Sequence, residues 1–103
     1  MRRGDVYWYE HPRAGRRPWV VLTRTEAVEV LNQVLAAPAT RTVRGIPTEV
    51  AVDETDGMPA SCVFALDNVA PIRKALCTSW ITTLAPPTMA ALCTALGHAT
   101  ACG

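Results

Sequence analysis

The stretch Ala14–Arg24, AGRRPWVVLTR, decides the fold, because an apolar run begins in it directly after two arginines and a proline. Residues 19–23 are predicted to form a strand that is covered on both faces, since the run shows no alternation with polar side chains. Pro18 fixes the backbone at the start of this strand. Two interpretations of Arg17 stay open at this point: a solvated loop charge, or a guanidinium held on a rigid scaffold.

Further short strands separated by turns are expected on both sides of this stretch. Before it, residues 3–10 read as a strand with Val6 and Trp8 on one face and Tyr7 and Tyr9 on the other, and residues 11–17 read as a loop. After it, a short helix or an irregular segment is expected at 25–32, a basic turn at 41–46 and an acidic turn at 53–59. The remaining strands are expected at 33–39 (ending at Thr40), 47–52, 61–66, 69–72 and 79–84.

The C-terminal part changes its period from that of a strand to that of a helix. Pro86 and Pro87 suit a helix start, and an apolar stripe follows at positions i, i+3, i+4 and i+7, namely Met89, Leu92, Cys93 and Leu96. Gly97 is expected to end this helix. The predicted fold class is therefore mainly β with a C-terminal helix. A small closed barrel is favoured, because closure removes exposed strand edges.

Length and composition predict a single folded domain spanning residues 1–103, since half of the 103 residues are hydrophobic and only 18% are charged. The net charge is +1, but residues 1–24 carry six arginines against two carboxylates. Arginine offers a planar fork of donors that suits phosphate. No secretory signal and no apolar run of about 20 residues is found, so a cytoplasmic protein that does not span a membrane is expected.

The four cysteines contain no Cys-x-x-Cys pair, and the two histidines do not complete a zinc pattern. We therefore expect four free thiols and no metal or cofactor. Cys62, Cys77 and Cys93 are expected to fill the core.

Four segments resemble, in their order and spacing, the MazF/PemK family of toxin endoribonucleases: RRGDVYWYE (2–10), RRPWVVLTR (16–24), APATRTVRGIPTEV (37–50) and CVFALDNVAPI (62–72). The resemblance implies an SH3-like barrel with a terminal helix, also used by gyrase-poisoning toxins of the CcdB type, and a homodimer. It implies metal-independent cleavage of single-stranded RNA that leaves 2′,3′-cyclic phosphate and 5′-hydroxyl ends. It also implies a cognate MazE-like antitoxin whose flexible acidic tail covers the active groove.

The resemblance assigns catalysis to Arg17, which precedes the proline of the second strand, and to Thr40 at the end of the third. A fixed guanidinium can stabilise the charge that develops on the phosphoryl oxygens, and a hydroxyl can donate to one of them. Thr42 is the alternative if the register slips by one side-chain period. Asp67 matches an acidic residue considered a general base in one branch of the family. That branch also has an arginine where Ala65 stands here, so its aspartate–arginine mechanism does not transfer whole.

The expected RNA-binding residues surround these positions: Arg13, Arg16, Arg41, Arg44 and Asn68. The arginines would contact phosphates independently of sequence, and Asn68 would read a base edge. His11 is a passive loop residue in the simpler interpretation. Trp8 and Trp80 are expected in the core or on a dimer surface rather than as stacking platforms. The alternative function is a CcdB-like toxin that binds gyrase without catalysis, which needs neither Arg17 nor Thr40.

Overall fold

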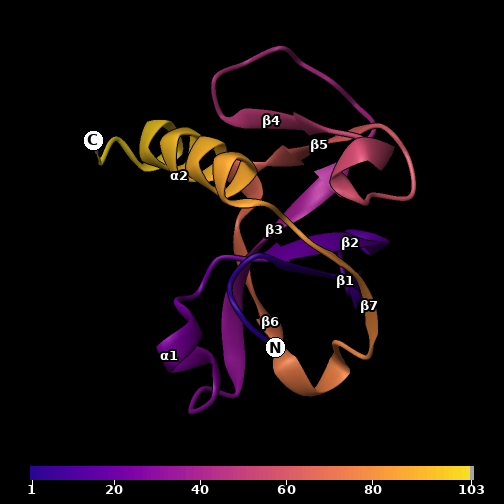
Figure 1. Cartoon of the computed structure of the whole chain (residues 1–103), viewed down its shortest axis with the longest axis vertical. Coiled ribbons are helices and arrows are strands. Elements are labelled where there is room, and N and C mark those ends of the chain that lie inside the picture. The colour runs from indigo at the N-terminus through magenta and orange to yellow at the C-terminus, as the bar shows by residue number, and fades with distance from the viewer. Residues whose placement is uncertain (103) are drawn as a thin grey trace.

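The computed structural model describes residues 1–102 and contains seven strands, two α-helices and three short 3-10 turns (Figure 1). The strands are β1 (Asp5–His11), β2 (Gly15–Val21), β3 (Gln33–Thr40), β4 (Glu49–Val52), β5 (Cys62–Ala65), β6 (Ala70–Arg73) and β7 (Ser79–Thr83). The helices are α1 (Thr25–Val28) and α2 (Pro86–Thr100), and the 3-10 turns are η1 (Glu54–Asp56), η2 (Leu66–Asn68) and η3 (Lys74–Leu76). The predicted class, mainly β with a C-terminal helix, is confirmed.

Strand β3 lies at the centre of the sheet, whose order is β4-β5-β3-β2-β1-β7 with β6 also paired to β3. The first half of β3 pairs with β6 and its last two residues pair with β5, so two strands share one of its edges. All pairings are antiparallel. This branching curls the sheet into a half-barrel, with β4 and β5 lying apart from β1, β7 and β6 in Figure 1.

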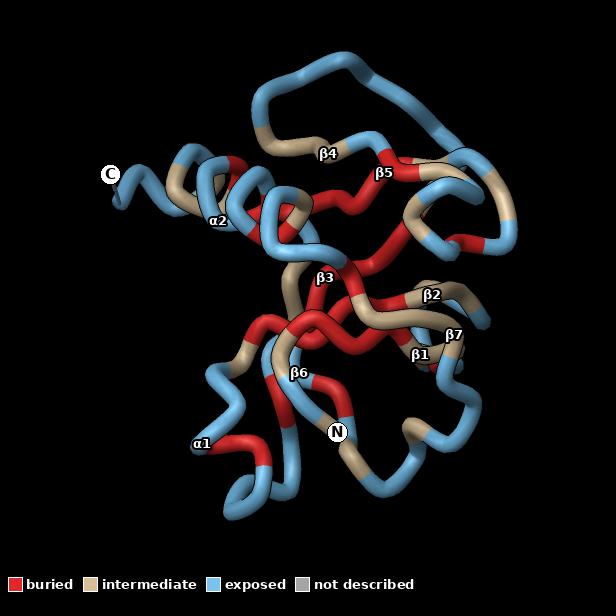
Figure 2. Tube along the Cα trace, viewed as in Figure 1, coloured by how far each residue is buried: buried red, intermediate tan, exposed pale blue. Residues whose placement is uncertain are grey.

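Hydrophobic side chains cover both faces of β2, as its unbroken apolar run predicts. Val20 belongs to a cluster that α2 closes with Met89 and Leu92, whereas Trp19 and Val21 belong to a second cluster on the other face. Buried segments therefore lie along the centre of the molecule, where β2 and β3 cross it (Figure 2). Within residues 1–102, no helix is both long enough and apolar enough to cross a bilayer.

Helix α2 packs against β4 and η2 and buries Met89, Leu92 and Ala95. The prediction that Gly97 ends the helix is wrong, because the helix continues to Thr100 and Ala101 adopts the left-handed conformation instead. The backbone N–H of Cys102 then donates to the Gly97 carbonyl at 3.0 Å, which satisfies one of the free carbonyls at the helix end. Cys93 is exposed rather than core-filling, since the buried stripe passes through Ala95.

The predicted loop at residues 11–17 is also too long, because β1 reaches His11 and β2 begins at Gly15. The Ala14 N–H donates to the His11 carbonyl at 3.2 Å, and Gly15 has φ 71°, which a glycine adopts without strain. A three-residue turn therefore joins the strands. Arg16 and Arg17 consequently lie on β2 itself, and their side chains point to opposite faces of the sheet.

Candidate active site

The ladder between β2 and β3 stops where each strand contains a proline. It pairs Trp19 with Pro38, Val20 with Ala37 and Val21 with Ala36, and no pair follows toward Arg17. Pro18 and Pro38 have no N–H to donate, so they cannot extend a ladder. The same register, continued past the last pair, sets Arg17 opposite Thr40 on one face. The interrupted ladder thus places two hydrogen-bond donors side by side on neighbouring strands.

Arg17 is held by the turn that precedes it. Its Nε donates to the Ala14 carbonyl at 3.0 Å, and the side chain is half-buried. A guanidinium has five N–H donors, so this bond leaves those on the two terminal nitrogens available. The tight turn therefore fixes the stem of the side chain and leaves its charged end ready to bind an anion.

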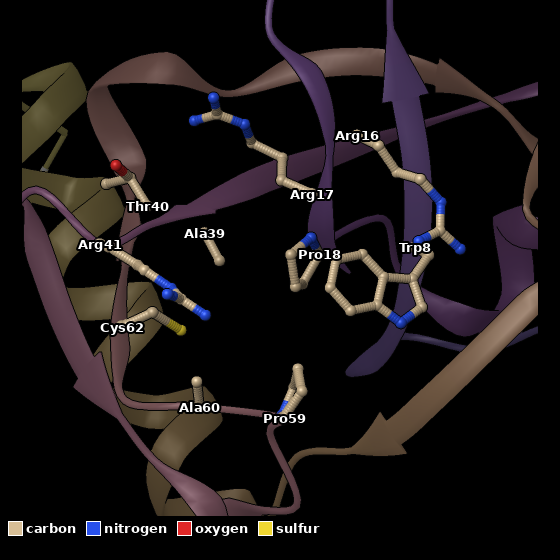
Figure 3. Close-up of a pocket in the computed structure, with 10 residues that line it drawn as sticks. All are labelled: Trp8, Arg16, Arg17, Pro18, Ala39, Thr40, Arg41, Pro59, Ala60 and Cys62. Carbon is tan, nitrogen blue, oxygen red and sulfur yellow. The ribbon is translucent and has the colours of Figure 1, made fainter.

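Thr40 presents its hydroxyl on the same side of the sheet as Arg17 (Figure 3). The Thr40 Oγ1 accepts a hydrogen bond from the backbone N–H of Thr42 at 3.2 Å. Because this bond uses a lone pair of the oxygen, the hydroxyl proton stays free for donation. Thr42 therefore orients Thr40 through its backbone, while its own side chain lies two positions farther along the same face.

Arg17 and Thr40 line a small hollow of about 160 Å³, which we call the polar hollow. The other lining residues include Thr42, Arg44, Asn68 and Glu49. Glu49 Oε1 accepts hydrogen bonds from the backbone N–H groups of Arg44 and Gly45, at 2.9 and 3.0 Å. Glu49 thereby holds the basic 41–46 loop against the site. Glu49 was not among the site residues expected from the sequence, although it lies within the strand expected at 47–52.

Arg17 and Thr40 also border a second hollow of about 320 Å³, which we call the tryptophan hollow (Figure 3). Its further lining residues are Trp8, Arg16, Pro18, Ala39, Arg41, Pro59, Ala60 and Cys62. The guanidinium carbon of Arg16 lies 4.7 Å from the centre of the Trp8 ring, which is a cation–π contact. The two expected catalytic donors therefore separate two hollows.

Asp67 and Arg13 line neither hollow, although Asn68, which follows Asp67, lines the polar hollow. The Asp67 carboxylate accepts a hydrogen bond from the Thr48 hydroxyl at 2.6 Å. Arg13 is exposed in the turn between β1 and β2, where its backbone N–H donates to Nδ1 of His11 at 3.2 Å. His11 stacks on Trp19 with ring centres 5.5 Å apart, so it supports the turn. The structure thus groups Arg17 and Thr40 with Arg16, Arg41, Arg44 and Asn68.

The tryptophans expected in the core or on a dimer surface differ in their surroundings. Trp8 lies in the wall of the tryptophan hollow, beneath Arg16. Trp80 is 59% exposed, so it is not a core residue.

All four cysteines are free thiols. Burial raises the pKa of the Cys62 thiol, and the nearby charge of Arg41 partly opposes that rise. Burial also raises the pKa of Cys77. Within residues 1–102, no three His, Cys, Asp or Glu side chains gather closely enough to hold a metal ion.

Residues 2–100 match the family model described as the PemK-like, MazF-like toxin of type II toxin–antitoxin systems. The chain is 40% identical over 101 residues to the probable endoribonuclease MazF5 of Mycobacterium tuberculosis, covering 97% of this chain and 93% of the relative. It is 31% identical over 103 residues to the probable endoribonuclease MazF2 of the same organism, covering 99% and 100%.

Solved structures of similar proteins agree with this match. An endoribonuclease in complex with its cognate antitoxin, from a mycobacterial species, superimposes with a TM-score of 0.90 at 27% identity, covering 100% of this chain and 97% of that one. Mycobacterium tuberculosis toxin MazF-mt6 superimposes with a TM-score of 0.86 at 32% identity, covering 94% and 96%. The alternative of a CcdB-like gyrase-binding toxin is not favoured. The family model, the relatives and the fold together show that the chain belongs to the PemK-like, MazF-like toxins of type II toxin–antitoxin systems.

Proposed function

We propose that the protein is the toxin of a type II toxin–antitoxin pair and an endoribonuclease that cuts single-stranded RNA at a short sequence. The observation that carries this proposal is the end of the β2–β3 ladder, where Arg17 and Thr40 present unused donors side by side. A phosphodiester has two anionic oxygens, and a fixed guanidinium and a hydroxyl are suitable partners for them. No metal ion or other cofactor is needed for this arrangement.

In the proposed reaction, the ribose 2′-oxygen forms a bond to phosphorus and the bond from phosphorus to the 5′-oxygen breaks. The products are a 2′,3′-cyclic phosphate and a 5′-hydroxyl. Arg17 and Thr40 stabilise the negative charge that grows on the phosphoryl oxygens. The leaving 5′-oxygen takes its proton from water, assisted by a hydrogen bond from Arg17, because an arginine side chain does not give up a proton in proteins.

Asp67 is the proposed acceptor of the 2′-hydroxyl proton. Its carboxylate accepts one hydrogen bond, from the Thr48 hydroxyl, in the free protein, and it keeps further lone pairs that could take the proton. Glu49 is the carboxylate that lines the polar hollow, and it is the competing candidate. Asp67→Asn is expected to slow cleavage strongly while Glu49→Gln loosens RNA binding by releasing the 41–46 loop. The reverse pattern would identify Glu49, rather than Asp67, as the general base.

RNA is proposed to bind through the arginines around the two hollows, Arg16, Arg41 and Arg44, with Arg13 at the outer turn and Asn68 reading a base. We further propose a single domain over residues 1–103 that acts in the cytoplasm as a homodimer. An exposed face over β3 and β6 supports the dimer: Leu31, Leu35, Pro71 and Ala75 supply its apolar part, and Arg73 and Lys74 also line it. A cognate MazE-like antitoxin is proposed as the inhibitor, bound across the arginine-rich site.

The test is to incubate the purified protein with a long single-stranded RNA in EDTA and to map the ends of the fragments. Discrete cuts with 5′-hydroxyl ends are expected from the wild type. Arg17→Ala and Thr40→Ala are expected to abolish them, whereas Trp80→Ala is expected to keep them, because Trp80 lines neither hollow. Absence of wild-type cutting across messenger, ribosomal and transfer RNA would contradict the proposal.

A further inference from the structure

We propose that the tryptophan hollow is a nucleobase subsite, which holds the base of a nucleotide adjoining the phosphate bound by Arg17 and Thr40. The inference rests on the proposed function, because it assumes that RNA is the ligand of that pair. It adds a second recognition site on the sheet face opposite to Asn68. The RNA strand would then cross the end of the β2–β3 ladder, with one nucleotide on each side of it.

Strand register places the two hollows on opposite faces of the sheet. β1 pairs Trp8 with Pro18, and the β2–β3 register continues this row to Ala39. In the next row on the same face, Arg16 pairs with Glu10, and Arg41 and Cys62 line the hollow beside it. Arg17 and Thr40 belong to the alternate positions, whose face carries the polar hollow with Pro38, Thr42 and Ala65. The catalytic pair therefore marks the crossing point from one face to the other.

The lining of the tryptophan hollow suits a planar, partly apolar ligand that is attached to an anion. Its walls combine an indole and two prolines, Pro18 and Pro59, with small residues, and its charged members are all arginines. Among the lining residues no carboxylate is present. The volume of about 320 Å³ lies at the lower end of the roughly 300–1,000 Å³ found for small-molecule sites. A free phosphate would leave the apolar wall unused, whereas a nucleotide uses both parts.

The contact between Arg16 and Trp8 brings two stacking surfaces together. The exposed Arg16 guanidinium lies 4.7 Å from the ring centre in the free protein. Aromatic and guanidinium planes are the surfaces on which single-stranded RNA bases stack. Removal of one such aromatic platform weakens binding by about 10- to 100-fold. Trp8 is therefore assigned to base recognition, in place of the core or dimer role expected from the sequence.

The experiment measures binding rather than cleavage, so that it can fail independently of the proposed function. The ligand is a short RNA that contains the mapped cut site, with a 2′-deoxy sugar at the scissile position to prevent cleavage. If no cut is found, a library of short RNAs containing pyrimidines and purines is used instead. Fluorescence anisotropy gives the dissociation constant of this RNA and of versions in which one base at a time is absent. Each is measured with the wild type, Trp8→Ala, Trp8→Phe and the matched control Trp80→Ala.

Loss of one base beside the cut is expected to weaken wild-type binding by about 10- to 100-fold. The same loss should have little further effect on Trp8→Ala, because the stacking partner is already gone. Trp8→Phe should restore most of the dependence on that base, and Trp80→Ala should behave as the wild type. Ala60→Leu fills the hollow without changing Trp8. It should reduce the contribution of the same base to RNA binding and leave the contributions of the other bases unchanged.

The subsite would be overturned if removal of each base still weakened binding to Trp8→Ala and to Ala60→Leu as much as it weakens binding to the wild type. A Trp8→Ala variant that binds RNA normally but no longer binds an acidic, aromatic-containing antitoxin peptide would also overturn it, since the hollow would then serve a protein ligand. If the wild type binds RNA with this base dependence yet never cleaves it, the subsite stands and the catalytic proposal fails.

Discussion

At the scale of single residues, the hydroxyl of Thr40 offers a direct test of how the site binds phosphate. It accepts the N–H of Thr42 and keeps its own proton for donation. Thr40→Val removes both abilities at almost constant volume, so kcat is expected to fall by about 10²–10³, the effect of losing one fixed donor. Thr40→Ser keeps the hydroxyl and should retain activity within about 10-fold of the wild type. Loss of activity in Thr40→Ser together with an active Thr40→Val would mean that the methyl group, rather than the hydroxyl, matters at this position.

Cys62 reports on the charge inside the tryptophan hollow. Burial raises the pKa of its thiol, and Arg41 opposes the rise. Since the thiolate is the reactive form, Arg41→Ala should raise the pKa further and slow alkylation of Cys62 by iodoacetamide at every pH below the new pKa. Mass spectrometry of peptides, followed against pH, separates Cys62 from the exposed Cys93 and Cys102. Arg41→Lys keeps the charge and is the matched control, and faster alkylation in Arg41→Ala alone would indicate that access rather than charge dominates.

At the scale of elements, substitution of two glycines by alanine should change the free energy of unfolding in opposite directions, because their backbone conformations differ. Gly97 lies inside α2, where an added Cβ would meet only the Cys102 carbonyl at 3.8 Å. Gly97→Ala is therefore expected to raise the free energy of unfolding by about 0.5–1 kcal/mol. Gly57 has φ 91°, and its Cβ would overlap the side chain of Thr82, so Gly57→Ala should lower it by about 1–3 kcal/mol. Urea titration measures both changes, and a destabilised Gly97→Ala would show that the end of α2 is strained.

The elements also show which parts of the fold local sequence can predict. The apolar run after Pro18 and the helical stripe that begins at Met89 identify β2 and α2, because each pattern reflects burial of the element's own residues. The start of β2 could not be found in this way. The residues at the end of the β1–β2 hairpin carry no apolar period, and the backbone pairing of Glu10 with Arg16 and of His11 with Gly15 makes them strands.

The candidate site could likewise be predicted from the sequence only in part. The motif of Arg17 and Thr40 is visible in the sequence, but their juxtaposition depends on a ladder that Pro18 and Pro38 interrupt together. Glu49 was missed because its role arises from hydrogen bonds to the backbone of the preceding loop, which no side-chain pattern encodes. The position of Asp67 likewise depends on the hydrogen bonds that Leu66 and Asp67 make with Thr48, which lies far from them in the chain.

At the scale of the whole molecule, the exposed apolar face over β3 and β6 predicts the surface of the proposed homodimer. Leu35 is 40% exposed and lines this face together with Leu31 and Ala75, and burial of apolar surface is the main favourable term in association. Leu35→Arg adds a charge next to Arg73 and Lys74, so it should raise the dimer dissociation constant by at least about 10-fold. Sedimentation equilibrium over a range of protein concentrations measures this shift.

The control is Trp80→Arg, which places the same charge on β7, outside the apolar face. It should leave the dimer constant unchanged, and circular dichroism should show both variants folded. If Trp80→Arg dissociates the dimer and Leu35→Arg does not, the two-fold axis passes through β7, where the 59% exposed indole is the largest apolar group on that strand. The tryptophan hollow would then lie nearer to the partner subunit, since Trp8 neighbours Ser79 across the β1–β7 ladder. The oligomer measurement therefore also decides whether the nucleobase subsite belongs to one chain or lies close to the dimer interface.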